Sequence, residues 1–322
     1  MSCFKMIYSI MYKTLMHDDY QKTLVNTLKF EGIGLHTGEK TIVEIKPADA
    51  NEGIIFKRVD LKKNNIVVAN YKNVTSAKLC TTLENKHGVK VSTVEHLLAA
   101  LYIAGIDNAL IEVNSEEVPI MDGSAKVFLE KLYKSEIKKL SKKRKYLRVN
   151  NKIELVDGDR RISLEPNNSL EVNFQLNYQN RIIGNQKNKV NFEIDNLHDV
   201  SNSRTFCLYK DIEKIKKAGL AKGGSLDNAV VVDENSVLND GGLRNDKEFV
   251  NHKILDLIGD FLLSGYRILG KVTCYQGGHE LTNLFLRKLF NYKSSLQVFE
   301  SKNIIVSKEI SHKQSSKIAV NA

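Results

Sequence analysis

The alternation of hydrophobic and polar positions predicts a strand-rich segment in each half of the chain. In the first half, residues 41–45 alternate between the two kinds of side chain, and the apolar run at 109–113 is typical of a buried strand. Similar short runs predict further strands at 53–56, 66–69, 146–154, 161–165, 170–176 and 270–274.

Amphipathic runs predict two helices in each half. The first covers residues 97–103 and ends at Gly105. It follows Ser92-Thr93-Val94-Glu95, a capping-box pattern in which Glu95 would serve the helix N-terminus for structural reasons alone. The other three predicted helices cover residues 124–133, 248–264 and 280–290.

The order helix, glycine, strand, loop, helix occurs in both halves. This recurrence predicts an α+β fold built from two similar α/β-sandwich domains that arose by internal duplication. The predicted parts are an N-terminal extension at 1–21, a first domain at 22–137, a basic linker at 138–145, a second domain at 146–300 with an insertion around 178–247, and a polar C-terminal tail at 301–322.

The composition is that of a globular protein with an excess of basic residues. Of 322 residues, 42% are hydrophobic and 27% charged, while 48 Lys and Arg against 38 Asp and Glu leave a net charge of +10. Such an excess attracts anionic partners, whether nucleic acid, anionic lipid or a phosphorylated substrate. Much of it lies in the run 138–145, which we interpret as a solvated linker.

Cysteine usage and hydropathy predict a cytoplasmic location. The four cysteines, Cys3, Cys80, Cys207 and Cys274, form no CxxC pair, which fits free thiols in a reducing compartment. The apolar start at 1–16 is broken by lysines and has no cleavage site, so we do not expect a secretory signal. No apolar stretch approaches the about 18 residues needed to span a bilayer.

One candidate cluster lies on the predicted helix at 248–264. His252, Asp256 and Asp260 are spaced i, i+4 and i+8, so they share one helix face. A histidine and a carboxylate four residues apart can bind the same cation, as the two histidines of an HExxH helix do. The alternative is a polar face turned to water, although such a face would be expected to carry more lysine in this lysine-rich chain.

Two other segments contain candidate catalytic residues. Glu95-His96 begins the first predicted helix, where the capping box explains Glu95 and His96 could be an ordinary core or surface histidine. His279 follows Gly277-Gly278, where a backbone can bend sharply, and could act as a general acid or be structural. HExxH, Walker A and GxSxG motifs are absent, so the sequence does not indicate a zincin protease, a P-loop nucleotidase or a serine hydrolase.

Seven segments occur in order along the chain. They are Gly32-Ile33-Gly34-Leu35-His36-Thr37-Gly38, Ser92-Thr93-Val94-Glu95-His96-Leu97, Val118-Pro119-Ile120-Met121-Asp122-Gly123-Ser124, Ser203-Arg204-Thr205-Phe206, Ala221-Lys222-Gly223-Gly224-Ser225, His252-Lys253-Ile254-Leu255-Asp256 and Gly278-His279. Together they resemble the UDP-3-O-acyl-N-acetylglucosamine deacetylase family of bacterial lipid A biosynthesis. The resemblance runs from about residue 22 to 290, and the candidate clusters lie within it.

The resemblance implies a metal-dependent amide hydrolase with its site between two similar domains. It implies that His96, His252 and Asp256 bind one Zn²⁺ per chain, although such a ligand set also accepts Fe²⁺. By the same analogy Glu95 is the general base and His279 the general acid. Supporting roles fall to three further residues: Asp260 holds His279, while Thr205 and Lys253 stabilise the oxyanion.

The resemblance also implies a substrate and its binding residues. The substrate is UDP-3-O-acyl-N-acetylglucosamine, a UDP-linked acylated amino sugar whose deacetylation is the committed step of lipid A biosynthesis. The enzyme would be a cytoplasmic bacterial protein that contacts the inner-membrane surface transiently. Candidate residues for the sugar or acyl chain are Phe206, Ile212, Ala221, Leu226 and Val231, with His36, Cys80 and Asp211 in matching segments near the site.

Two alternatives stay open. The charge of +10 and the small α+β units suit an RNA-binding protein, although aromatic residues make up only 7% of the chain and no RNP-like motif is present. A metal-dependent deacetylase of another acylated amino sugar would use the same residues.

Overall fold

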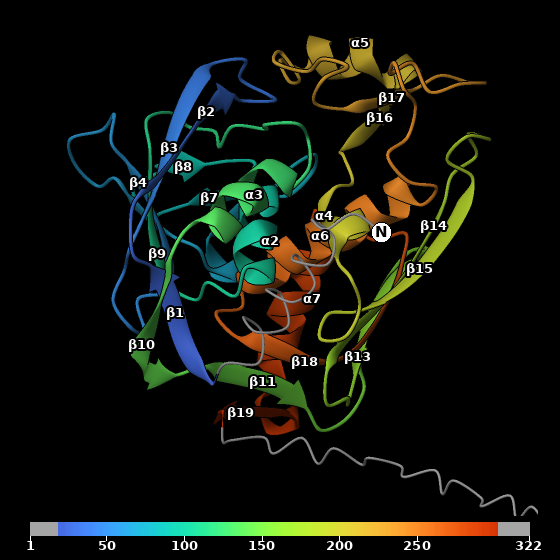
Figure 1. The fold of residues 1–322 in the computed structure, drawn as a ribbon. Helices are drawn as coiled ribbons and strands as arrows, with labels where there is room; N and C mark the ends of the chain where they lie inside the picture. Colours follow the sequence, from blue (N-terminus) through green and yellow to red (C-terminus); the bar gives the residue numbers. More distant parts are fainter. Residues whose placement is uncertain (1–18, 302–322) are drawn as a thin grey trace, which may run out of the picture.

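The structure, a computed structural model, describes residues 19–301. Two β-sheets lie on opposite sides of the molecule, and a layer of helices separates them (Figure 1). No helix within this described range is long and apolar enough to cross a membrane. The four helices of the central layer are α2 (Glu95–Ile103), α3 (Lys126–Lys134), α6 (Glu248–Leu262) and α7 (His279–Asn291).

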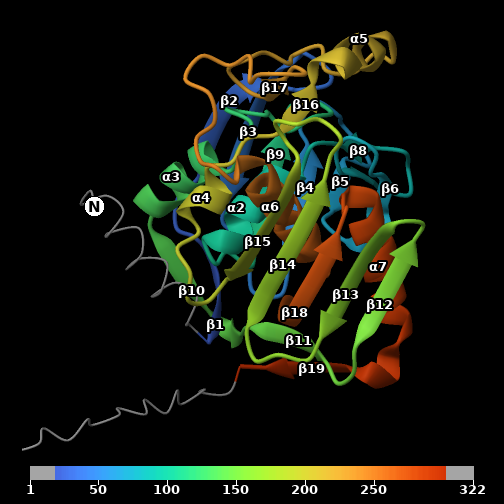
Figure 2. The same cartoon turned by 90° about the vertical axis from the view of Figure 1, so that its right-hand side faces the viewer.

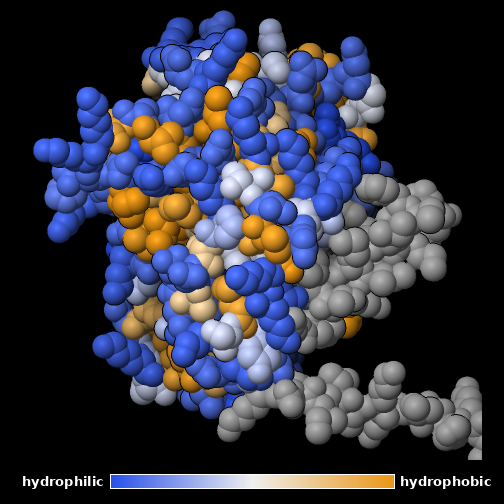
Figure 3. All heavy atoms as spheres, turned by 60° about the vertical axis from the view of Figure 1, so that its left-hand side comes forward, coloured by the Kyte–Doolittle hydropathy of each residue, from blue (hydrophilic) through white to orange (hydrophobic). Residues whose placement is uncertain are grey.

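The first half of the chain forms a five-stranded sheet. Along the sheet the order is β2 (Leu28–Ile33), β3 (Lys40–Lys46), β9 (Ala109–Val113), β4 (Ile54–Arg58) and β5 (Ile66–Val68). Alternate residues of β3, β4 and β9 are buried against the helices. These three strands and β5 confirm the strands predicted at 41–45, 53–56, 66–69 and 109–113 to within two residues at either end. On its other side the sheet leaves Ile33, Ile66 and Val68 43–44% exposed, and hydrophobic and hydrophilic side chains mix on that side of the molecule (Figure 3).

The second half forms a seven-stranded sheet around β18 (Figure 2). β18 pairs in parallel with β11 and β14 and antiparallel with β13. The predicted strand at 146–154 is wrong as a single element, because the chain turns at Asn150-Asn151 and separates β11 from β12. The seven strands are β11 (Lys145–Val149), β12 (Ile153–Asp157), β13 (Arg160–Glu165), β14 (Leu170–Asn177), β15 (Asn185–Asn191), β18 (Arg267–Tyr275) and β19 (Leu296–Glu300).

Smaller elements complete the described chain. Two short helices precede α6: α4 (His198–Ser201) and α5 (Tyr209–Lys217). Single 3₁₀ turns occupy Tyr71–Asn73 and Lys293–Ser295. Three small sheets are formed by β1 (Tyr20–Leu24) with β10 (Ile137–Lys143), by β6 (Val74–Ser76), β7 (Thr82–Glu84) and β8 (Lys90–Val91), and by β16 (Phe206–Leu208) with β17 (Val230–Val232).

Helices α2 and α6 pack directly against each other at the centre of the molecule. Every residue of α2 is buried, because helices and a sheet surround it. At the closest approach, a Cβ on Gly259 would lie 2.1 Å from the carbonyl oxygen of Glu95, so only glycine fits there. This contact brings the start of α2 beside the polar face of α6.

The capping-box prediction for α2 is wrong. The helix begins at Glu95 itself, and its N-cap, Val94, offers no side-chain hydrogen bond. The Ser92 hydroxyl donates instead to the carbonyl oxygen of Glu116 at 3.2 Å. The Glu95 carboxylate therefore has no capping role, and its burial requires another explanation.

The basic run at 138–145 is not a solvated linker throughout. Its first six residues lie in β10, which pairs with β1, and Lys145 begins β11. Arg144 is 2% exposed and forms a 2.8 Å ion pair with Asp107. The Arg144 guanidinium also donates to the carbonyl oxygen of Gly105 at the end of α2, so this residue joins the two halves inside the molecule.

Strands β1, β10 and β11 run across predicted domain boundaries. Tyr20 and Gln21 of the predicted extension belong to β1, whereas its residues 1–18 lie outside the described range. Residues 185–191 of the predicted insertion form β15, which extends the second sheet beside β14. Of the predicted tail, only Ser301 is described. The α+β class is confirmed, whereas the internal duplication and the two-domain division stay predictions.

Candidate metal centre and active site

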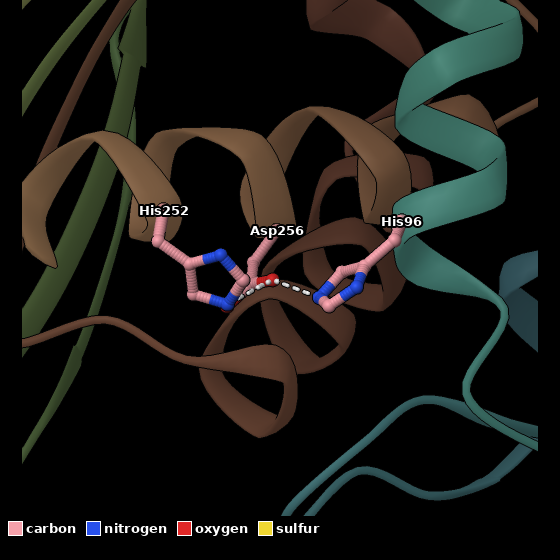
Figure 4. A group of neighbouring side chains, drawn as sticks. All are labelled: His96, His252 and Asp256. Carbon is pink, nitrogen blue, oxygen red and sulfur yellow. Dashed lines mark ion pairs between the residues drawn. The ribbon is translucent and has the colours of Figure 1, made fainter. Parts of the chain in front are cut away.

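Three predicted metal ligands converge where α2 meets α6 (Figure 4). His96 comes from α2, and His252 and Asp256 lie one turn apart on α6. One ligand atom from each lies within 4.8 Å of the other two. The Nε2 atoms of His96 and His252 are 3.5 Å and 3.3 Å from the Asp256 Oδ1 atom.

The protonation of these groups fits a divalent cation. The Nδ1 atom of His252 donates to the carbonyl oxygen of Ser203 at 3.1 Å, which leaves Nε2 as an unprotonated ligand atom. Burial lowers the pKa of His252 to about 3, so the ring is neutral. Burial acts to raise the pKa of Asp256, but electrostatic interactions with His252, Lys253 and His279 outweigh this effect and hold that pKa well below its usual range.

The Asp256 carboxylate supplies the clearest sign that this cluster suits a cation. Its Oδ2 atom accepts a 2.9 Å bond from the Lys253 ammonium, while its Oδ1 atom is buried without any hydrogen-bond partner. A buried ionised oxygen without a donor is costly unless a cation binds it. Two imidazoles and one carboxylate are a common ligand set for zinc.

Glu95 and His279 lie beside this cluster and face each other. The Glu95 Oε1 atom is 3.6 Å from the His279 Nε2 atom. Burial raises the pKa of Glu95 above its usual value, although the neighbouring histidines act in the opposite direction. A buried carboxylate with a raised pKa is suited to accept a proton from water.

Asp260 orients His279 and keeps it charged. The His279 Nδ1 atom donates to the Asp260 Oδ2 atom at 2.8 Å, which leaves Nε2 directed at Glu95 and Asp256. Burial lowers the pKa of His279, but the carboxylates of Asp260, Asp256 and Glu95 overcome this effect and raise it to about 10. The imidazolium is therefore available as a proton donor at neutral pH.

Thr81 supports both groups and was not predicted from the sequence. Its hydroxyl donates to the Asp260 Oδ1 atom at 2.6 Å, and its backbone N–H donates to the Glu95 Oε2 atom at 3.1 Å. Thr81 lies in a loop without hydrophobic periodicity, so only the folded structure brings it to the site.

Of the two predicted oxyanion residues, Lys253 contacts the cluster directly and Thr205 lines the cavity next to it. The Lys253 ammonium bonds Asp256 and lies 5.5 Å from the centre of the Phe206 ring. The Phe206 ring is 6.2 Å from the His252 ring, edge to face. The Thr205 backbone is fixed by a 2.8 Å bond to the carbonyl oxygen of Gly123, and its side chain lines a neighbouring cavity.

That cavity has a volume of about 460 Å³ and is bordered by β16, β17 and α5. His36 also lines it, whereas Asp211 and Cys80 do not. Burial raises the pKa of the Cys80 thiol to about 12, so this cysteine is an unreactive thiol at neutral pH. The cavity brings together all five residues predicted to bind sugar or acyl chain: Phe206, Ile212, Ala221, Leu226 and Val231.

Comparison with known proteins identifies the family. The sequence profile of LpxC, UDP-3-O-acyl N-acetylglycosamine deacetylase, matches residues 21–291. The chain belongs to this family. Its relatives include the UDP-3-O-acyl-N-acetylglucosamine deacetylases of Pseudoalteromonas translucida, 42% identical over 278 residues (85% of this chain and 92% of the relative), and of Geotalea uraniireducens, 42% identical over 282 residues (87% and 92%). That of Haemophilus ducreyi is 42% identical over 279 residues (85% and 91%).

Membership in the deacetylase family decides between the hypotheses drawn from the sequence. It confirms the resemblance and favours an enzyme over an RNA-binding protein. The family is metal-dependent, and the site formed by His96, His252 and Asp256 provides a matching ligand set.

Proposed function

We propose that this chain is a zinc-dependent hydrolase that removes the N-acetyl group of UDP-3-O-acyl-N-acetylglucosamine. The products would be UDP-3-O-acyl-glucosamine and acetate, on the route to lipid A. The observation that carries the proposal is the unpartnered, buried Asp256 Oδ1 atom between two histidines, directly beside the Glu95–His279 pair. The names of the relatives supply the substrate class.

His96, His252 and Asp256 would hold the zinc ion. When bound, zinc supplies a Lewis acid that polarises the acetyl carbonyl and makes water more acidic. Glu95 removes a proton from the attacking water, whose oxygen forms the new bond to the acetyl carbon. Burial suits Glu95 to this role, because its raised pKa strengthens it as a base.

His279 completes the reaction as the general acid. The tetrahedral intermediate collapses when its carbon–nitrogen bond breaks, and the His279 Nε2 atom donates a proton to the leaving amine. Asp260 and Thr81 keep that ring oriented through bonds of 2.8 Å and 2.6 Å. Lys253 and Thr205 would donate to the oxyanion while it carries charge.

The test of this function is a deacetylation assay on the acylated UDP-sugar with and without a chelator. Acetate release that the chelator abolishes and added zinc restores is the expected result. Equal rates on an acylated amino sugar without UDP would favour the alternative substrate. Salt-sensitive RNA binding by a metal-free protein would favour the RNA-binding hypothesis.

We expect the cavity to bind the acyl chain, with Ala221 limiting its depth. The Ala221→Leu variant should slow the deacetylation of long-chain substrates more than that of short-chain ones, by up to about 0.8 kcal/mol for each methylene excluded. Ala221 has a φ of 53°, so the Ala221→Gly variant, which adopts this φ without strain, is the matched control. The measurement is kcat/KM over a series of chain lengths. An equal loss at every length would contradict the prediction.

The predicted contact with a membrane surface has support at the rim of the cavity. Leu79, Tyr209 and Leu226 line the cavity and are 47–57% exposed. Helix α5 borders them and has basic residues in its last turn. We expect binding to anionic vesicles but not to neutral ones, and weaker binding when Lys214, Lys216 and Lys217 are replaced by Glu. Vesicle flotation measures this, and the same replacement at Lys138, Lys139 and Lys142 of β10 is the control. Equal weakening by both sets would refute a specific surface.

A further inference from the structure

Glu117 is a buried carboxylate that none of the roles above uses. Its side chain is 0% exposed, and it lies in the segment between β9 and α3. Within residues 19–301 its partners are backbone N–H groups and threonine hydroxyls rather than the side chain of a lysine, arginine or histidine. A buried charge without a counter-ion persists only where donors surround it, so the groups that hold Glu117 indicate what it does.

Hydrogen bonds from two separate segments hold this carboxylate. The Oε1 atom accepts from the Thr93 hydroxyl at 2.7 Å and from the His36 N–H at 2.9 Å. The Oε2 atom accepts from the backbone N–H and the hydroxyl of Thr37, at 2.7 Å and 2.8 Å. A Cβ at Gly34 would lie 2.4 Å from the Oε2 atom, so the close approach also requires glycine at that position.

The first of these segments contains Thr93 and continues into the metal centre residues of α2. Thr93 has a φ of 55°, a left-handed conformation that is strained for a β-branched residue. It lies directly before the N-cap of α2, two positions ahead of Glu95 and three ahead of His96. The bond to Glu117 holds this conformation, and the conformation determines how the chain enters α2.

The second segment is the turn at 34–38, which contacts the wall of the acyl cavity. The turn at 34–38 receives backbone bonds from the loop at 221–224: Lys222 N–H donates to the His36 carbonyl oxygen at 3.3 Å and Gly223 N–H to the Leu35 carbonyl oxygen at 3.0 Å. His36 and Ala221, one from each segment, both line the cavity. Glu117 therefore contacts the turn on which the cavity wall rests.

We propose that Glu117 is a positioning residue that links the acyl cavity to the metal centre. It keeps Thr93 in the conformation that directs Glu95 and His96 into the site, and it keeps the 34–38 turn in the position that seats the 221–224 loop. The proposal rests on the proposed function, because it takes the roles of those residues from there.

The Glu117→Gln variant tests both links. Each carboxylate oxygen of Glu117 accepts a hydrogen bond from a backbone N–H. In either orientation of the glutamine side chain, its –NH₂ group therefore faces a backbone N–H, and two donors oppose each other. We expect kcat to fall on the order of 10- to 100-fold, with less bound metal and a weaker preference for long acyl chains. Glu116→Gln, the same change at an exposed neighbour, is the matched control and should match the wild type.

A second substitution separates positioning from simple stability. Thr93→Gly added to Glu117→Gln should restore metal content and most of kcat, because glycine adopts the left-handed φ without the hydrogen bond. It should not restore the chain-length preference, which depends on the 34–38 turn. A Glu117→Gln variant that melts at a lower temperature but keeps wild-type kcat, metal content and chain preference would overturn the proposal.

Single variants keep the test decisive if Glu117→Gln does not fold. Thr93→Val should lower metal content and kcat, whereas Thr37→Val should weaken only the chain-length preference. Wild-type behaviour of both would overturn the proposal. Failure of the proposed function would look different, since the wild-type protein itself would then release no acetate from the UDP-sugar.

Discussion

Replacement of His252 or Asp256 by alanine is expected to remove the bound metal and lower kcat/KM by roughly 10³-fold or more. The size of this fall follows from the pKa of the attacking water. A zinc ion would lower that pKa to about 7, and without the ion it returns toward 15.7. Asp256 lies between both histidines, at 3.5 Å and 3.3 Å, so its loss leaves them without the carboxylate that joins them. The measurement is the metal content of purified protein together with the rate of acetate release.

The controls separate loss of metal from loss of fold. His87→Ala removes an exposed imidazole in the turn between β7 and β8 and should retain metal and activity. Asp256→Ala also leaves the half-buried Lys253 ammonium without its carboxylate partner, so a thermal melt should accompany the assay. Full metal occupancy in either ligand variant would disprove the ligand assignment.

The sequence predicts the parts of this site that lie on one element. The i, i+4 spacing of His252 and Asp256 places both on one face of a helix, and α6 has that arrangement. Residues that arrive from other elements are harder to predict. Nothing local indicates that Gly259 lets α2 approach to within van der Waals contact, and that approach brings His96 to the cluster.

Two incorrect predictions have the same physical origin. The pattern Ser92 to Glu95 matches a capping box, but tertiary hydrogen bonds to Glu116 and Glu117 hold the segment in another conformation. The pattern of the lysine-rich run predicts a solvated linker, yet a partner distant in sequence, Asp107, holds Arg144 inside the molecule. In both cases a distant acidic residue or its backbone outweighs the local preference, and a single sequence does not show which distant residue will be near.

The general acid and base are expected to give a bell-shaped pH profile of kcat/KM with two separable limbs. Glu95 must be ionised, so activity falls as the pH drops through its pKa, which burial raises above the usual range. His279 must be protonated, so activity falls as the pH rises through its pKa, raised to about 10 by Asp260, Asp256 and Glu95. A cation bound beside His279 repels its proton, so the basic limb should appear below pH 10 in the zinc enzyme.

Removal of either group should lower kcat about 10²- to 10⁴-fold without loss of metal. Glu95→Ala should lose the acidic limb and His279→Ala the basic limb, because each variant lacks the group that titrates there. Asp260→Asn is the informative companion: it keeps an oxygen for the His279 Nδ1 atom but removes the negative charge 2.8 Å away, so the basic limb should move to lower pH while the shape of the profile survives. If His279→Ala retained the wild-type rate and both limbs, the proton for the leaving amine would have to come from another group. Lys253 would be the next to test, because its ammonium lies 2.9 Å from the same Asp256 Oδ2 atom that the His279 Nε2 atom approaches at 3.7 Å.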